Sequence, residues 1–234
     1  VLGSRGLGDV YKRQDPSYSG QILVTTYPLI GNYGVPRREE ENGLSRFYES
    51  EKIHVEALVV SDYSFEYSHW NANKSLADWL KEEKIVGIYD IDTRELTKLL
   101  RVHGSMKGKI VFEDGEDIDF VDPNLTNLVA KVSCKEVIRY GNGNKKVVLV
   151  DCGVKHNIIR CLLKRDVTVI RVPWDYDFNT IEYDGLFISN GPGDPDMCDV
   201  TVEHIRKAMN GTKPIFGICM GCLLYTSPSP RDPK

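Results

Sequence analysis

The stretch Pro214-Ile215-Phe216-Gly217-Ile218-Cys219-Met220-Gly221 decides how the second half of the chain is expected to fold. Its first residues form a short apolar run, which is typical of a buried strand. The run enters Gly-x-Cys-x-Gly, the pattern of a nucleophile elbow, in which a sharp strand-to-helix turn holds one reactive side chain at the edge of a sheet. Flanking glycines give so tight a turn the room it needs. The pattern predicts Cys219 as a nucleophile, and a thiol needs less activation than a hydroxyl.

A packing role for the same cysteine is the alternative. Cysteine is among the residue types most often buried, and a cysteine between glycines after a strand can simply fill space. A motif is a hypothesis until its structural context is known. The octapeptide alone therefore leaves both interpretations open.

The preceding sequence supplies that context. Apolar runs at 147–150, 167–172, 185–189 and 213–218 alternate with helical patterns at 158–163 and 202–209. Continuous apolar runs are typical of parallel strands that are buried on both faces. The alternation predicts an open, doubly wound α/β sheet, in which ligands bind at the carboxyl ends of the strands.

A second feature falls at such a carboxyl end, in the sequence Asn190-Gly191-Pro192-Gly193. Taken alone, it is most simply a turn. It lies one strand–helix–strand step before the elbow, where its backbone N–H groups can stabilise an oxyanion that forms when a thiolate attacks a carbonyl. This position favours a catalytic interpretation.

The first half of the chain also alternates strands and helices. Strand composition occurs at 21–27, 55–60 and 85–91, and capping patterns open helices at Ser75 and Asp92. We expect the second helix to present an apolar face of Leu96, Leu99 and Leu100 and to end at Gly104. Residues 112–144 are acidic and then rich in Gly and Asn, which indicates a linker.

Composition excludes several classes of function. The chain has 234 residues, 41% of them hydrophobic, with a net charge of -4, so nothing in its charge favours nucleic acid or an anionic membrane as a partner. No apolar run is long enough to cross a bilayer, and we expect a cytoplasmic protein. Six scattered cysteines without a CxxC pair indicate reduced thiols, not a disulfide framework or a metal site.

The two ends look foreign to the rest. Residues 1–14 and 222–234 show no helical or strand periodicity and resemble translated adapter sequence, which is to be excluded from fold analysis. A naturally disordered terminus is the alternative. The expected organisation is an N-terminal α/β domain at 15–144, whose start is missing, and a truncated second domain at 145–221.

Six segments together resemble class I glutamine amidotransferases, and more narrowly the glutamine-hydrolysing small subunit, or equivalent N-terminal region, of carbamoyl-phosphate synthetase. The first three segments point to the carbamoyl-phosphate enzyme and are most similar to its fused eukaryotic form of the pyrimidine pathway, whereas the last two occur across amidotransferases. The segments cover nearly all of 15–221 and are Asp15-Pro16-Ser17-Tyr18, Thr26-Tyr27-Pro28-Leu29-Ile30-Gly31-Asn32-Tyr33-Gly34, Asp92-Thr93-Arg94-Glu95-Leu96-Thr97, Asp151-Cys152-Gly153-Val154-Lys155, Ser189-Asn190-Gly191-Pro192-Gly193-Asp194-Pro195 and Phe216-Gly217-Ile218-Cys219-Met220-Gly221.

The resemblance implies that the whole protein cleaves glutamine to glutamate and ammonia. The ammonia would pass to a synthetase portion, either a separate large subunit or fused domains, that joins it to bicarbonate. Cys219 would form a glutamyl thioester, and the N–H groups of Gly191 and Met220 would form the oxyanion hole. Ser17, Gly191, Gly193 and Met220 would contact glutamine. No cofactor is implied for this region, since ATP and Mg²⁺ belong to the synthetase portion.

The chain also departs from the family. After the elbow the family has His-Gln, where this chain has Cys222-Leu223, and the family's catalytic His and Glu lie farther downstream. His156 and His204 precede the elbow and do not correspond to that His. We therefore expect this chain to be inactive on its own. Two alternatives remain: a partner-binding module of a carbamoyl-phosphate synthetase assembly without chemistry of its own, and a different cysteine hydrolase on a similar sheet. Whether the product would serve pyrimidines or arginine stays open.

Overall fold

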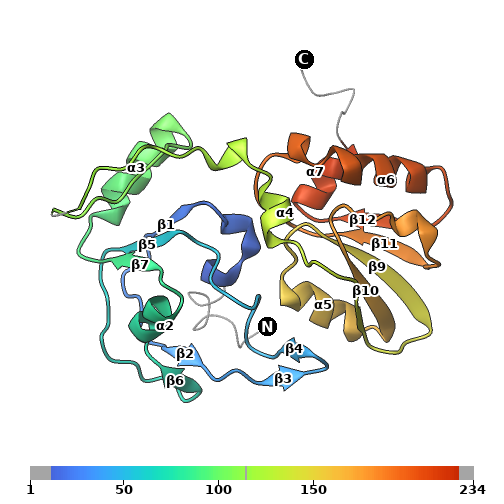
Figure 1. The fold of residues 1–234 in the computed structure, drawn as a ribbon. Helices are drawn as coiled ribbons and strands as arrows, with labels where there is room; N and C mark the ends of the chain where they lie inside the picture. Colours follow the sequence, from blue (N-terminus) through green and yellow to red (C-terminus); the bar gives the residue numbers. More distant parts are fainter. Residues whose placement is uncertain (1–11, 114, 227–234) are drawn as a thin grey trace.

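The computed structural model describes residues 12–113 and 115–226, which form two α/β units, each built on its own sheet of mainly parallel strands (Figure 1). Most of both adapter-like ends, at 1–11 and 227–234, lies outside the described residues. The strands are β1 Ile22–Thr25, β2 Val35–Pro36, β3 Glu40–Glu41, β4 Leu44–Ser45, β5 Ala57–Val60, β6 Ala72–Lys74, β7 Val86–Ile88, β8 Ile138–Tyr140, β9 Lys145–Asp151, β10 Val167–Pro173, β11 Gly185–Ile188 and β12 Ile215–Gly217. The α-helices are α2 Leu76–Glu82, α3 Thr93–His103, α4 Leu128–Val132, α5 His156–Leu163, α6 Asp199–Met209 and α7 Met220–Thr226. Short 3₁₀ turns are η1 Pro16–Tyr18, η2 Pro123–Leu125, η3 Phe178–Thr180 and η4 Pro195–Met197.

The first unit has the strands and caps that its sequence predicts. Its sheet has the order β1-β5-β7, and both pairings are parallel. The Ser75 side chain accepts a hydrogen bond from Asp78 N at the start of α2, and Asp92 accepts one from Glu95 N at the start of α3. Gly104 ends α3 with a φ of 76°, a conformation that glycine adopts without the cost a side chain brings. Local cap chemistry thus fixes both helices.

The second unit is an open doubly wound sheet, as expected. Its strand order is β12-β11-β9-β10-β8, with α6 and α7 over one face and α5 over the other (Figure 1). Along β9, Val148 and Val150 belong to the core on the α6 and α7 side, whereas Leu149 belongs to the core around Ile159 of α5. Successive residues of a strand point to opposite faces. The apolar run of β9 is therefore buried on both sides, as the continuous pattern predicts.

The expectation of a linker at 112–144 is wrong in part. Strand β8 lies within this segment and pairs antiparallel with β10 at the edge of the second sheet. Helix α4 lies there too, with Leu128 and Val129 buried. Neither element shows in the sequence because β8 has three residues and α4 has five, too short for a periodic pattern. The domain boundary near residue 144 stays a prediction, with β8 already part of the second sheet.

Each end segment contributes buried residues to the fold. Gln14 is buried, accepts a hydrogen bond from Glu49 N and donates one to Ser50 O. At the other end, residues 222–226 continue α7, and Leu224 is buried in the core of the second unit. The origin of these end segments from adapter sequence stays a prediction.

Helix α3 covers its expected apolar face only in part. Leu96 and Leu100 are half-buried, Leu99 is 46% exposed, and Thr93 is the one fully buried residue of this helix. Val102 is 77% exposed, and the following segment adds exposed Met106, Phe112 and Phe120. The expected face is thus present, and its three leucines lie outside the buried core of the first unit. Among the described helices, none is both long and apolar enough to cross a membrane.

A charged contact joins the two units. Arg160 of α5 donates to the Glu49 carboxylate over 2.7 Å and to the backbone oxygens of Ser45 and Tyr48. Glu49 in turn accepts from the N–H of Asn157 at the start of α5. A paired guanidinium with several acceptors tolerates such burial because every partner is satisfied. The loop after β4 is therefore fixed on the second unit.

Two buried histidines lie in the same region. His54 Nε2 is 2.7 Å from Ser50 Oγ, and His156 Nε2 is 3.8 Å from Glu51 Oε1. Burial, aided by Lys52, lowers the pKa of His54 from 6.5 to about 4. Burial, aided by Arg171 and Arg160, lowers the pKa of His156 to about 4 as well. Both imidazoles are therefore neutral in the folded protein at pH 7.

These shifts predict how stability depends on pH. Unfolded histidines bind protons near pH 6.5, whereas the folded ones do so near pH 4, so the free energy of unfolding falls as pH drops from 6.5 to 4. The expected slope is about 1.4 kcal/mol per pH unit for each histidine. Urea unfolding at pH 7, 6 and 5 measures it. The double variant His54→Gln, His156→Gln should be flatter over this range, and an unchanged slope in that variant would contradict the assignment.

Candidate functional site: a cysteine elbow built from both units

Cys219 occupies the turn between β12 and α7 in a strained backbone conformation. Its φ is +53°, in the left-handed region that residues with side chains rarely adopt. Such outliers persist only where the surrounding structure enforces them, and they gather at functional sites. The side chain is exposed, so the sulfur is not enclosed among apolar groups. The strand-to-helix elbow expected from the sequence is present (Figure 1).

The two flanking glycines are required by space. A Cβ on Gly217 would lie 2.5 Å from the backbone oxygen of Gly221, and a Cβ on Gly221 would lie 2.3 Å from the backbone oxygen of Ile188. Both obstacles are backbone atoms, which cannot rotate away as side chains do. Any other residue at either position would force the turn open.

Backbone hydrogen bonds hold this elbow against the end of β11. Ile218 N donates to Ile188 O and Gly221 N donates to Ser189 O, each over 3.0 Å. The next residues are Asn190 and Gly191, so the oxyanion-loop candidate starts beside the elbow, on the neighbouring strand of the sheet. The structure thus brings together the two features that the sequence placed on neighbouring strands.

The residues predicted to form the oxyanion hole, Gly191 and Met220, have backbone N–H groups that are free of backbone acceptors among the described residues. In the described part of the chain, neither Gly191 N nor Met220 N donates a backbone hydrogen bond. Met220 is the first residue of α7, and the first N–H groups of a helix lack partners within the helix. Gly191 is buried, and its Cβ position would be 2.1 Å from the Cys152 backbone oxygen, so this residue must also be glycine for packing reasons.

The other two candidate site residues, Ser17 and Gly193, differ in their surroundings. Ser17, from the first unit, reaches the second unit directly, because Asn190 Nδ2 donates to its hydroxyl oxygen over 2.9 Å. Gly193 has a φ of +82° and faces Leu128 of α4, with 3.2 Å between its Cβ position and Leu128 Cβ. Among the described residues, no hydrogen bond joins Gly193 to the elbow. Ser17 is therefore tied to the loop more firmly than Gly193.

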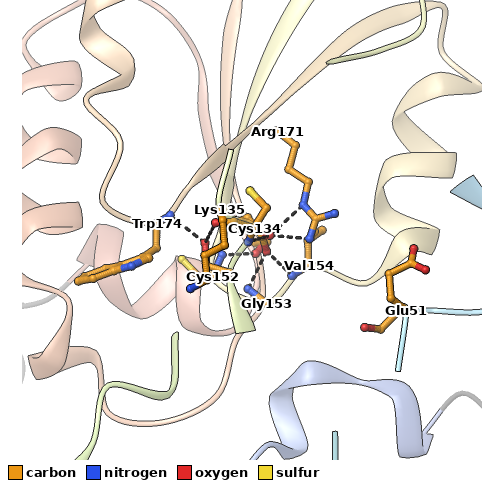
Figure 2. Close-up of polar contacts among 12 residues, drawn as sticks. Glu51, Cys134, Lys135, Cys152, Gly153, Val154, Arg171 and Trp174 are labelled. Carbon is orange, nitrogen blue, oxygen red and sulfur yellow. Dashed lines mark hydrogen bonds and ion pairs between the residues drawn. The ribbon is translucent and has the colours of Figure 1, made fainter. Parts of the chain in front are cut away.

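A buried carboxylate organises the loop behind the site. The side chain of Asp151, at the end of β9, is fully buried, and its Oδ1 accepts from the N–H groups of Gly153 and Val154. Its Oδ2 accepts from Cys134 N and, in an ion pair of 2.6 Å, from Arg171 Nη2. Figure 2 shows these groups converging on one carboxylate. A buried charge with this many donors is well compensated.

That loop in turn supports the oxyanion-loop candidate. Cys152 N donates to Ser189 Oγ over 2.9 Å, and Ser189 Oγ donates to Asn190 O over 2.8 Å. Asn190 Nδ2 also donates to Gly153 O. The sequence shows these residues only as parts of motifs and gives no sign of these hydrogen bonds. The signal for Asp151 was available, since Asp-x-Gly directly after a strand is typical of a side chain that caps its own turn.

The six cysteines are all free, but they differ in reactivity. Burial raises the pKa of the Cys134 thiol to about 12 and that of Cys198 to about 11. Burial also raises the pKa of Cys152 well above its ordinary value. Thiolates are the reactive form, so these three are inert at neutral pH. Cys219 and its neighbour Cys222 are the exposed thiols of the described residues.

No histidine of the described residues is hydrogen-bonded to Cys219. His204 Nδ1 lies 3.4 Å from Asp177 Oδ1, and His156 faces Glu51, which agrees with the expectation that neither is a catalytic base. Across 12–113 and 115–226, no three His, Cys, Asp or Glu side chains gather where they could hold a metal ion. The elbow itself supplies an exposed thiol and, at Met220, a backbone N–H group.

A cysteine on a nucleophile elbow at the carboxyl edge of a doubly wound sheet defines a class of α/β proteins with nucleophilic cysteine chemistry. Family comparisons are consistent with that class. Residues 11–110 match the model for "Carbamoyl-phosphate synthase small chain, CPSase domain", and residues 148–227 match "Glutamine amidotransferase class-I". The chain belongs to the carbamoyl-phosphate synthase small-chain family, with a CPSase domain followed by a class I glutamine amidotransferase domain.

Individual relatives carry different names. The chain is 52% identical over 88% of its length to "Multifunctional protein pyr1-3" of Dictyostelium discoideum, and 51% identical over 96% of its length to "Carbamoyl-phosphate synthase [ammonia], mitochondrial" of Homo sapiens. It is 47% identical over 88% of its length to "Carbamoyl phosphate synthase arginine-specific small chain" of Saccharomyces cerevisiae. The matches cover 10%, 15% and 53% of these relatives, so the chain spans from about a tenth to about half of their length.

The elbow geometry predicts an unequal cost of two glycine substitutions. Gly221→Ala places a methyl group against the Ile188 carbonyl and should lower the free energy of unfolding by about 1–3 kcal/mol. Gly185→Ala, in adjacent β11, puts its Cβ in ordinary contact at 3.7 Å from Pro214 and serves as the matched control. Denaturant unfolding measures both. Equal stability of the two variants would show that the elbow is looser than described.

Proposed function

We propose that the whole protein hydrolyses glutamine through Cys219. The sulfur attacks the side-chain amide carbon of glutamine, the carbonyl oxygen takes up the negative charge, and collapse of this intermediate breaks the C–N bond. The nitrogen takes up the proton that the thiol released and leaves as ammonia, and a glutamyl thioester remains. Water then cleaves the C–S bond to give glutamate and the free thiol. The N–H groups of Gly191 and Met220 would hold the oxyanion, a contribution of about 3 kcal/mol for one donor in a known case.

One observation carries this proposal: an exposed cysteine at φ +53° directly precedes a helix whose first N–H has no backbone partner among the described residues. Sequence identity does not decide the nitrogen source, because a relative named for ammonia and a multifunctional relative are 51% and 52% identical to the chain. The match to class I glutamine amidotransferases, together with the strained thiol, is therefore the argument for glutamine.

The alternative is a module that binds a synthetase without chemistry of its own. It would need no strained thiol, and a cysteine with ordinary φ would fold at lower cost. The retained elbow, with two glycines that admit no Cβ, favours catalysis.

The ammonia would be consumed by a synthetase portion, fused or separate. Ser17, Gly191, Gly193 and Met220 would contact glutamine, and no cofactor is proposed for this region. ATP and Mg²⁺ would act in the synthetase portion, where ammonia and bicarbonate become carbamoyl phosphate for pyrimidine or arginine synthesis. The small-chain match and the relatives that extend far beyond the aligned region support a synthetase partner. We also place the whole protein in the cytoplasm.

The exposed side of α3 is the proposed contact for that synthetase portion. We define the α3 face as the exposed apolar side chains of α3 and of the segment that follows it: Leu99, Val102, Met106, Phe112 and Phe120. Monomeric proteins rarely leave large contiguous apolar patches uncovered, and such patches mark interaction sites. Leu99, Val102 and Met106 lie within residues 11–110, which match the small-chain CPSase domain, so a synthetase is the partner that we propose for this face.

Site-directed labelling tests the glutaminase proposal. A chloroketone analogue of glutamine should alkylate Cys219 in preference to the other thiols, because recognition of its amino acid portion brings the electrophile to the elbow. Peptide mass spectrometry locates the label. Cys219→Ser should abolish labelling at this peptide, whereas Cys222→Ser, which removes the adjacent exposed thiol, should not. Equal labelling of Cys219 and Cys222, unaffected by added glutamine, would refute the proposal.

A second test addresses the α3 face. Val102→Glu should weaken binding of a separately produced synthetase portion from a fused relative by tenfold or more, since it buries a charge in the interface. Val200→Glu on α6, also at an exposed valine, is the matched control and should leave the affinity unchanged. Fluorescence anisotropy measures both. The same affinity for Val102→Glu and the unchanged chain would rule this face out.

A further inference from the structure

Asn190 connects the two units at the site. Its side chain is 3% exposed, and its Nδ2 lies 2.9 Å from Gly153 O and 2.9 Å from Ser17 Oγ. Ser17 lies 173 positions away in the sequence, in the other unit. One buried amide thus contacts the loop after β9 and the residue expected to touch glutamine.

Hydrogen-bond chemistry fixes the direction of both contacts. A backbone carbonyl can only accept, so the Asn190 atom facing Gly153 O must be the NH₂ group. The same NH₂ faces Ser17 Oγ and, having no lone pair to offer, can only donate to it. Ser17 Oγ is therefore an acceptor in this contact, and its own hydrogen remains available.

Nothing in the described residues takes up that hydrogen. Asp15 Oδ1 accepts from the backbone N–H of Ser17 at 3.0 Å and from Asn190 Nδ2 at 3.4 Å, and Asp15 Oδ2 pairs with Lys155 Nζ at 3.1 Å. Within the described ranges, Ser17 Oγ donates no hydrogen bond. Ser17 is half-buried, so part of its surface is accessible to a ligand.

We propose that Asn190 is a positioning residue that makes the Ser17 hydroxyl a dedicated hydrogen-bond donor to the α-carboxylate of the amino acid substrate. This inference rests on the proposed glutaminase function. A hydrogen-bond donor needs an acceptor, and glutamine offers two acceptor groups: its α-carboxylate and its side-chain carbonyl oxygen. The Gly191 and Met220 N–H groups are assigned to the carbonyl, which leaves the carboxylate for Ser17. Hydrogen bonds to a charged group are stronger than neutral ones.

Protection of Cys219 from alkylation tests the inference. The measured quantity is the concentration of L-glutamine that halves the rate of Cys219 alkylation by iodoacetamide, read by peptide mass spectrometry. L-Glutaminamide, in which a carboxamide replaces the α-carboxylate, is the matched competitor. In the unchanged chain, glutamine should protect at a concentration at least about tenfold lower than glutaminamide.

Asn190→Asp keeps the shape of the side chain and replaces the donor by an acceptor. The aspartate would accept the Ser17 hydrogen and turn it away from the substrate, so glutamine protection should weaken by about tenfold and the preference over glutaminamide should shrink. Asn210→Asp, at the exposed end of α6 and also before a glycine, should change neither value. The alkylation rate without competitor shows whether the elbow stays accessible in each variant.

A double-mutant cycle separates positioning from general damage to the loop. If Asn190 acts through Ser17, Asn190→Asp should weaken glutamine protection clearly less in a Ser17→Ala background than in the unchanged chain, because there only its contact with Gly153 O is left to lose. An equal loss in the two backgrounds, or glutamine protection that survives Asn190→Asp, overturns the inference while leaving the proposed function intact. Absence of any glutamine protection in the unchanged chain overturns both.

Discussion

Close approach of backbone to backbone is the constraint on which the site depends. Where β9, β11 and β12 end, Gly191 lies against the Cys152 carbonyl, Gly221 lies against the Ile188 carbonyl, and Gly217 lies against Gly221. No side chain fits at these three positions. The result is a rigid junction that enforces the left-handed conformation of Cys219 and leaves its sulfur at the surface. Strain of this kind needs support from the surrounding packing, and three strand ends provide it.

Charged groups extend this rigidity to the first unit. The Asp151–Arg171 pair fixes the loop after β9, on which Asn190 rests, and the Glu49–Arg160 pair fixes the loop after β4 on helix α5. Both pairs have low exposure and further hydrogen bonds, so each holds its loop in one position. The candidate substrate contact at Ser17 therefore comes from one unit and the candidate nucleophile from the other. A site of this kind is complete only when both units are docked.

Sequence patterns predicted most of this arrangement, because its strands are continuous apolar runs and its helices begin at cap residues. The elbow was predictable for a similar reason: Gly-x-Cys-x-Gly after an apolar run is the pattern of a sharp strand-to-helix turn, although the octapeptide alone left a packing role open. What the sequence could not show are contacts between distant positions. In the sequence, Asp151 is recognisable only as a turn residue, and its ion pair with Arg171 does not show. The contact of Asn190 with Ser17 does not show either. Strand β8 was missed because three residues at a sheet edge carry no periodic signal.

The most direct measurement of the central claim is a crystal structure of the chain with Cys219 alkylated by the chloroketone analogue of glutamine. The carbonyl oxygen of the bound analogue stands where the oxyanion forms. The account predicts that this oxygen lies about 3 Å from both Gly191 N and Met220 N, with Cys219 still at positive φ. A carbonyl oxygen directed to solvent, with both N–H groups bonded elsewhere in the protein, would contradict it.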